Sequence, residues 1–290
     1  MSTRSNEDRI GAIPTLATQQ DDKLDQPTLE TTGLKFITPT EFVELPSKGR
    51  FYKADHPLYN QDIVEIKHMT TREEDILTSV TLLKKGLALD RMLSSILINK
   101  KVKVDDLFLG DKNALIISAR IHGYGESYDT TIKCPTCELS QEYSFDLNSL
   151  EVHFPTEDLL NIYGVEITEN GTLSFPLPKT EYVIELRFLT GGDEKKILEA
   201  QSHKKKINFV GSTVSDFLKF VIISVNGVTD KRQLTDFIST LPALHARYIR
   251  KVYNKIMPGV TMEHPFACSE CDYEGALEVP LTANFFWPDA

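Results

Sequence analysis

The chain has 290 residues, of which 41% are hydrophobic and 26% are charged, a composition that is ordinary for a soluble globular protein. Because its formal net charge is −10, a general phosphate-binding surface is not expected, and we expect no nucleic-acid partner. No apolar run approaches the roughly 20 residues that cross a bilayer, so we expect no membrane-spanning segment.

Residues 1–32 are polar and contain few large apolar side chains. Such a segment cannot bury enough apolar surface to offset the entropy that ordering costs, so we predict a flexible N-terminal arm. The arm is either a disordered tail or a segment that orders against a neighbouring subunit. Because the first residues lack the apolar core of a secretion signal, we expect the protein to remain in a reducing cytosol.

Residues 33–126 are predicted to form an extended segment followed by a three-helix unit. The start of the first helix has two candidate capping boxes, Thr70 with Glu73 and Thr71 with Glu74. In both, the acid lies where the helix dipole favours negative charge. The third helix is strongly apolar, which indicates that it is largely buried.

All four cysteines of the chain form two Cys-x-x-Cys pairs, Cys134 with Cys137 and Cys268 with Cys271. Each pair lies between two strand-like stretches, which predicts the two halves of a split ribbon at residues 127–148 and 260–283. A set of four cysteine ligands leaves no open position on the metal, so it is typical of structural zinc. We therefore predict that the two halves meet on one structural Zn²⁺. The alternatives are a ribbon without metal and a redox or disulfide role.

Residues 149–259 are predicted to be an inserted region of strands and helices. Two antiparallel strands, at residues 173–177 and 182–188, are expected to join the sheet of the ribbon. One of the later helices is expected to contain Ile222 and Ile223. The predicted fold class is α+β, with two helical blocks joined through a small antiparallel sheet that contains the split four-cysteine zinc ribbon.

Residues 284–290 form an aromatic C-terminal tail that contains Phe285, Phe286 and Trp287. These side chains either pack on the protein's own core or project as an anchor for a partner, because aromatic residues are enriched in interface hot spots. We keep them as candidate partner-binding residues. The seven histidines show no metalloprotease spacing and the glycines form no phosphate loop, so we predict no catalytic residues and no enzymatic activity.

Four stretches are similar, in this order, to one protein family. They are LPSKGRFY at residues 45–52, MTTREEDIL at 69–77, LGDKN at 109–113 followed by Arg120, Tyr124 and Tyr128, and VPL to FFWP at 279–288. In this order they resemble the baseplate-hub proteins of T-even-type contractile-tailed bacteriophages. The resemblance covers most of the chain from about residue 40.

The resemblance implies a structural or assembly protein of the phage tail baseplate hub that acts through protein–protein contacts. Its expected partners are other phage tail and baseplate proteins, and it is a candidate homo-oligomer. Its expected location is the host cytoplasm during assembly and the tail baseplate of the virion if it is retained there. No catalytic residues carry over from this family.

Two other functions remain open. The first is a non-virion assembly chaperone of the tail hub, which is released when assembly ends. The second is a zinc-ribbon nucleic-acid-binding factor. Acidic residues around the two cysteine pairs argue against phosphate contact, namely Glu138, Glu270, Asp272 and Glu274.

Overall fold

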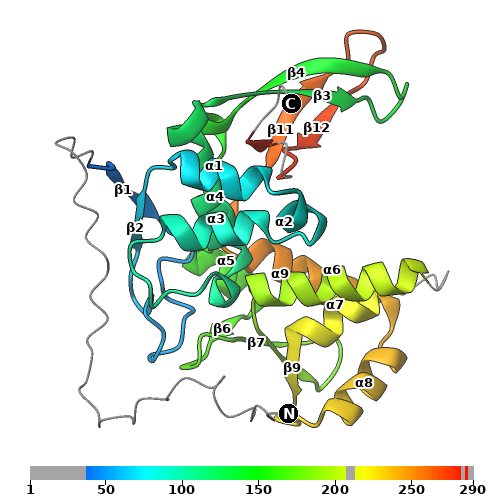
Figure 1. Cartoon of the computed structure of the whole chain (residues 1–290). Helices are drawn as coiled ribbons and strands as arrows, with labels where there is room; N and C mark the ends of the chain where they lie inside the picture. The colour runs from blue at the N-terminus through cyan, green and yellow to red at the C-terminus, as the bar shows by residue number, and fades with distance from the viewer. Residues whose placement is uncertain (1–36, 207–212, 282–284, 287–290) are drawn as a thin grey trace, which may run out of the picture. The chain divides into compact units, whose positions relative to one another are not determined.

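The computed structural model describes residues 37–206, 213–281 and 285–286, with no side-chain placement for 200–206 and 213. The predicted arm (1–32) and Trp287 therefore lie outside the described residues. The chain divides after Ile37, and the folded unit begins at Thr38. Helices and antiparallel sheets are mixed along this unit, which confirms the predicted α+β class (Figure 1).

The N-terminal part of the folded unit is a β-hairpin followed by helices. Its elements are β1 (Thr40–Glu44), β2 (Ile63–Lys67), α1 (Thr71–Thr78), α2 (Val80–Lys84), α3 (Ala88–Ile96), the 3-10 turn η2 (Val104–Asp106) and α4 (Leu109–Tyr124). Glu73 accepts a hydrogen bond from the backbone N–H of Thr70 at 2.9 Å, so the first of the two candidate capping boxes marks the start of α1. The first predicted helix is interrupted at Ser79, whose backbone is extended.

The predicted ribbon stretches form two separate hairpins. The first consists of β3 (Ser127–Lys133) and β4 (Ser140–Asp146), and the second of β11 (Glu263–Ala267) and β12 (Glu274–Glu278). Each hairpin is a two-stranded antiparallel sheet of its own, so the single joining sheet that the sequence predicted is wrong. Figure 1 shows the two hairpins at the same end of the folded unit.

The region between the hairpins has its own sheet. Its elements are η3 (Leu147–Ser149), β5 (Val152–His153), α5 (Glu157–Tyr163), β6 (Glu166–Ile167), β7 (Leu173–Pro176), β8 (Val183–Leu186), α6 (Gly191–Lys206), α7 (Thr213–Val221), β9 (Ile222–Val225), α8 (Lys231–Thr240), α9 (Ala243–Ile256) and β10 (Gly259–Val260). A four-stranded sheet has the order β6-β7-β8-β9. Because β7 and β8 pair within this sheet, the prediction that they join the ribbon is wrong.

Ile222 was expected in a helix but lies in β9, opposite Leu186 of β8. Both a local preference and a tertiary contact explain why Ile222 is in a strand. The β-branched run at Ile222–Val225 suits a strand, and the edge of β8 offers it a ladder of hydrogen bonds. Both Ile222 and Leu186 are buried there.

Two hydrophobic cores lie within the folded unit. The first joins the N-terminal helices to both ribbon segments and includes Leu93, Leu115, Phe145 and Phe285. The second joins the four-stranded sheet to the later helices and includes Ile184, Leu218 and Ile249. Phe51 comes from the N-terminal segment but packs in the second core, so the two cores do not correspond to two separate stretches of the sequence.

Buried charges also connect the two regions. Lys112 of α4 forms ion pairs with Asp90 of α3 at 2.8 Å and with Glu194 of α6 at 2.7 Å. Asp111, fully buried in α4, accepts hydrogen bonds from the Ser47 hydroxyl at 2.6 Å and the Tyr52 hydroxyl at 2.7 Å. Because these groups come from distant segments, they fix α4 as the element around which the rest packs.

Candidate metal centre

The two hairpin turns present the cysteines in the same way. The turn of β3–β4 holds Cys134 and Cys137, and the turn of β11–β12 holds Cys268 and Cys271. In each turn, the backbone N–H two residues after the first cysteine donates to its sulfur. Thr136 donates to Cys134 at 3.4 Å, and Glu270 donates to Cys268 at 3.4 Å. Such N–H···S contacts favour the thiolate form that binds metal.

The structure brings the four predicted ligand residues together. The Sγ atoms of Cys134 and Cys271 are 3.7 Å apart, as are those of Cys137 and Cys268. All four Sγ atoms lie within 4.8 Å of one another. Tetrahedral zinc with Zn–S bonds of about 2.3 Å holds its sulfur ligands roughly 3.8 Å apart, so this donor set fits such an ion.

All four cysteines of the chain are free thiols, so none of them forms a disulfide. Cys134 is buried, whereas the other three are half-buried. Within the described part of the chain, no other group of histidines, cysteines and acids is close enough to hold a metal.

The pKa values of Cys134 and Cys271 are shifted in opposite directions. Burial raises the pKa of Cys134, but the backbone N–H groups of Cys137 and Thr136 outweigh it and lower this pKa to about 6. At Cys271, the Tyr273 N–H lowers the pKa, but burial and the neighbouring thiols raise it to about 12. Four sulfur atoms this close cannot all be thiolates unless a cation lies among them, because like charges repel.

Side-chain hydrogen bonds also link the two hairpins. The Tyr143 hydroxyl in β4 donates to the carbonyl oxygen of Pro265 in β11 at 2.6 Å. The Gln141 side-chain oxygen in β4 accepts from the Ser269 hydroxyl at 3.0 Å. These two β4 residues therefore hold the second hairpin against the first without any strand pairing. Neither role could be read from the sequence, because polar residues on a half-exposed strand are common.

Of the three aromatic residues in the C-terminal tail, the structure describes Phe285 and Phe286. Phe285 and Phe286 are both 0% exposed and belong to the first core, so for these two side chains the exposed-anchor alternative is wrong. Their burial is secured by Arg120, whose Nε donates to the Phe285 carbonyl at 2.8 Å. A partner-binding role stays a prediction for Trp287.

Comparisons with known proteins decide the family. A family model described as "T4 bacteriophage base plate protein" matches residues 38–287. The chain belongs to this family. Searches of curated proteins and of solved structures returned no significant match. The match confirms the resemblance to baseplate proteins of T-even-type phages, and it spans residues 38–287, where the similar stretches lie except for residue 288.

Membership of the baseplate family supports a structural or assembly role, contacts with other phage proteins and a location in the tail of the virion. It also favours a non-enzymatic role. Among the helices that the structure describes, none is long and apolar enough to span a membrane.

Proposed function

We propose that this baseplate protein is a structural or assembly component of the tail hub, with a structural Zn²⁺ held by Cys134, Cys137, Cys268 and Cys271. One observation carries the metal part of the proposal: four thiols from two distant hairpins converge within 4.8 Å. When bound, the ion would supply charge neutralisation and four strong bonds, but no open position for a reaction.

The proposed role of the centre is to fasten the chain's end to its middle. The two Cys-x-x-Cys pairs are more than a hundred residues apart in the sequence, and the strands of one hairpin do not pair with those of the other. The second core is built mainly from the segment between them. A metal shared by both turns would therefore hold this large segment in a fixed relation to the N-terminal helices.

Metal analysis of the reduced, untagged full chain tests this role. We expect about one zinc per chain, and Cys134→Ser with Cys271→Ser should remove it. Thr136→Ala is the matched control, because this exposed turn residue contacts Cys134 only through its backbone N–H. Protein that contains no zinc, or a double serine variant that retains it, would contradict the metal centre.

Placement in the hub is tested separately by mass spectrometry of purified particles. A retained hub component is expected in the particles at a fixed ratio to other baseplate proteins, and it should cross-link to them. Detection only in lysates of infected cells would instead support the alternative of an assembly chaperone that is released.

The nucleic-acid alternative makes a different prediction. The cysteine turns carry exposed acids, Glu138, Glu270, Asp272 and Glu274, against one nearby cation, Lys133. A phosphate backbone would be repelled by such a surface, so we expect no complex in a gel shift at physiological salt. A salt-sensitive complex that zinc removal abolishes would favour this alternative over the hub.

A further inference from the structure

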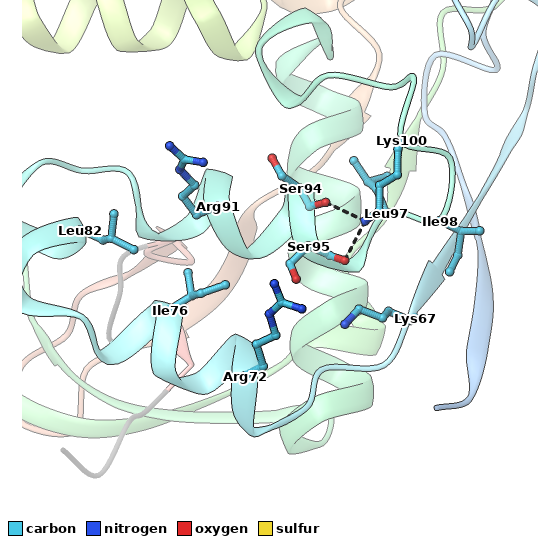
Figure 2. A pocket seen from close by; sticks show the side chains of 10 residues that line it. All are labelled: Lys67, Arg72, Ile76, Leu82, Arg91, Ser94, Ser95, Leu97, Ile98 and Lys100. Carbon is cyan, nitrogen blue, oxygen red and sulfur yellow. Dashed lines mark hydrogen bonds between the residues drawn. The ribbon is translucent and has the colours of Figure 1, made fainter. Parts of the chain in front are cut away.

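A hollow lies in the N-terminal part of the folded unit, and all of its lining residues precede the cysteines in the sequence. It has a volume of about 620 Å³ and is open to solvent. It is formed by the end of β2, by α1 and α2, by α3 and by the residues that follow α3 (Figure 2). Its lining residues are Lys67, Arg72, Ile76, Leu82, Arg91, Ser94, Ser95, Leu97, Ile98 and Lys100. We call it the basic hollow.

The charge of the basic hollow is opposite to that of the whole chain. Four of its lining residues are cations and none is an acid, although the chain has a net charge of −10. Arg72, Arg91 and Lys100 form no ion pair with any described residue. Figure 2 shows Arg72 and Lys67 projecting toward the end of α3, where Ser94 and Ser95 lie. The hollow thus concentrates positive potential that the protein itself does not neutralise.

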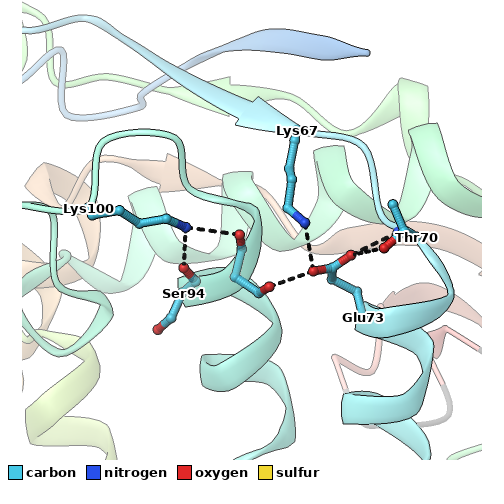
Figure 3. Close-up of polar contacts among 6 residues, drawn as sticks. Lys67, Thr70, Glu73, Ser94 and Lys100 are labelled. Atoms are coloured by element: carbon cyan, nitrogen blue, oxygen red, sulfur yellow. Dashed lines mark hydrogen bonds and ion pairs between the residues drawn. The ribbon is translucent and has the colours of Figure 1, made fainter. Parts of the chain in front are cut away.

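A buried acid beneath the hollow fixes its architecture. Glu73 is 0% exposed and binds Lys67 at 2.8 Å, the Thr70 hydroxyl at 2.6 Å and the Ser95 hydroxyl (Figure 3). Burial raises the pKa of Glu73, but these hydrogen bonds outweigh it and lower the pKa to about 2. Glu73 is therefore ionised, and among the described residues its ion pair is with Lys67.

Lys100 is held at the rim by the end of α3. Its Nζ donates to the carbonyl oxygens of Ser94 at 3.1 Å and Ser95 at 3.0 Å. Burial lowers the pKa of Lys100, and repulsion by Lys67 and Arg72 lowers it further, while attraction by Glu73 offsets part of this shift. An anion between these cations would relieve that repulsion, and one N–H of Lys100 is left to bind it.

The hollow is suited to a chain segment rather than to a single ion. Four of its lining residues are apolar, Ile76 and Leu82 on one side and Leu97 and Ile98 on the other (Figure 2), and Ile98 is 43% exposed. A second hollow of about 380 Å³ shares Arg91, Ser94 and Lys100 with it and continues along α3. The two acids that line this second hollow, Asp90 and Asp105, are both paired with Lys195. A small phosphate ion would leave both the apolar lining residues and this extension without a contact.

We propose that the basic hollow is a docking site for a short acidic segment of a partner protein, in which Asp or Glu side chains alternate with an apolar residue. The carboxylates bind the guanidinium groups of Arg72 and Arg91 in forked pairs and also contact Lys100. The apolar residue packs on Ile98. The inference rests on the assembly role only in that a partner protein supplies the segment.

The test is fluorescence anisotropy on the full chain with a labelled short peptide of Asp, Glu and Leu. Arg72→Glu with Arg91→Glu is expected to weaken peptide binding at least about tenfold, because two attractive pairs become repulsive. Lys231→Glu with Arg232→Glu changes the net charge equally on exposed α8 residues and should leave binding unchanged. Ile98→Ser should weaken binding a few-fold through loss of the apolar contact.

Each contrary result identifies a different error. Equal loss in both charge-reversal variants would show that binding is only a long-range charge effect. Equal binding of a peptide with Asn and Gln in place of the acids would show that the hollow does not recognise carboxylates. Displacement of the peptide by equimolar inorganic phosphate or by oligothymidine would assign the hollow to phosphate groups instead. None of these outcomes alters the zinc content, so this proposal and the metal centre fail independently.

Discussion

The ribbon hairpins and the helical cores of this baseplate protein are stabilised in different ways. α3 buries five of its nine residues, whereas β3, β4 and β11 bury one each and β12 buries none. An isolated two-stranded hairpin is marginal in water, because it hides too little apolar surface. The comparison indicates that the hairpins depend on the cysteine centre, while the helices depend on apolar packing.

Removal of the metal is expected to have the largest effect, and this effect should be confined to the hairpins. With a chelator, or with Cys268→Ser and Cys271→Ser, amides of β11 and β12 should lose most of their protection against hydrogen exchange. The reason is that zinc binding energy, about 10 kcal/mol or more in small zinc domains, is also folding energy. Amides of α3 and α4 should keep their protection.

Hydrogen exchange followed by mass spectrometry measures both sides in one sample. The Thr136→Ala variant serves again as the control for a change within a cysteine turn. If the amides of β11 and β12 exchanged at the same rate with and without chelator, the apolar contacts of the hairpins would be sufficient to keep them folded. The hairpins would then not depend on the metal.

The second expected effect lies where the two regions meet. Arg120 is buried in α4 and donates to the carbonyl oxygens of Gly125 at 2.6 Å, Ser127 at 2.9 Å and Phe285 at 2.8 Å. Arg120→Met keeps much of the volume but leaves three acceptors without a donor. Urea denaturation should show a loss of about 3 kcal/mol or more in the free energy of unfolding.

Arg232→Met is the control for this change, because Arg232 is exposed on α8 and surface substitutions stay within about 0.5 kcal/mol. A loss at Arg120 no larger than this would mean that water replaces the guanidinium. In that case α4 and the aromatic tail would be held together by packing alone.

The sequence could predict the local parts of the site. The spacing of Cys134 and Cys137, repeated at Cys268 and Cys271, encodes two turns between strands, and Glu73 encodes a helix start. Such patterns are read from a few neighbouring residues, and the structure contains them. The fold class follows from the same periodicities.

The sequence could not predict which elements pair over long distances. Ile222 suits either a buried helix or a strand, and only the free edge of β8 decides the outcome. From the sequence, Phe285 and Phe286 either pack on the core or project as an anchor, and only the placement of Arg120 and Tyr128 beside Phe285 decides between the two. The basic hollow escaped notice for the same reason, since its cations come from β2, α1, α3 and the loop after it.

The third expected effect is a pH dependence of the helical side. The pKa of Glu73 falls from 4.5 to about 2 on folding, so its contribution is present above pH 4.5 and is lost as the pH falls toward 2. The contribution corresponds to about 3 kcal/mol. In Glu73→Gln, unfolding free energies measured by urea denaturation should decline less steeply over this window than in the unaltered protein. Parallel declines would show that other carboxylates dominate acid unfolding.

The smallest expected effect tests how much of the contact between the hairpins is independent of metal. Tyr143→Phe keeps the ring that packs on Phe266 but removes the hydrogen bond to the Pro265 carbonyl. We expect a loss of about 1 kcal/mol with zinc bound, measured by thermal unfolding, and unchanged zinc content. With zinc removed, the substitution should have no further effect on unfolding, because the second hairpin has already separated from the first. If Tyr143→Phe destabilised the metal-free protein as much as the metal-bound one, the hairpins would associate through side chains first, and the metal would only reinforce a contact that already exists.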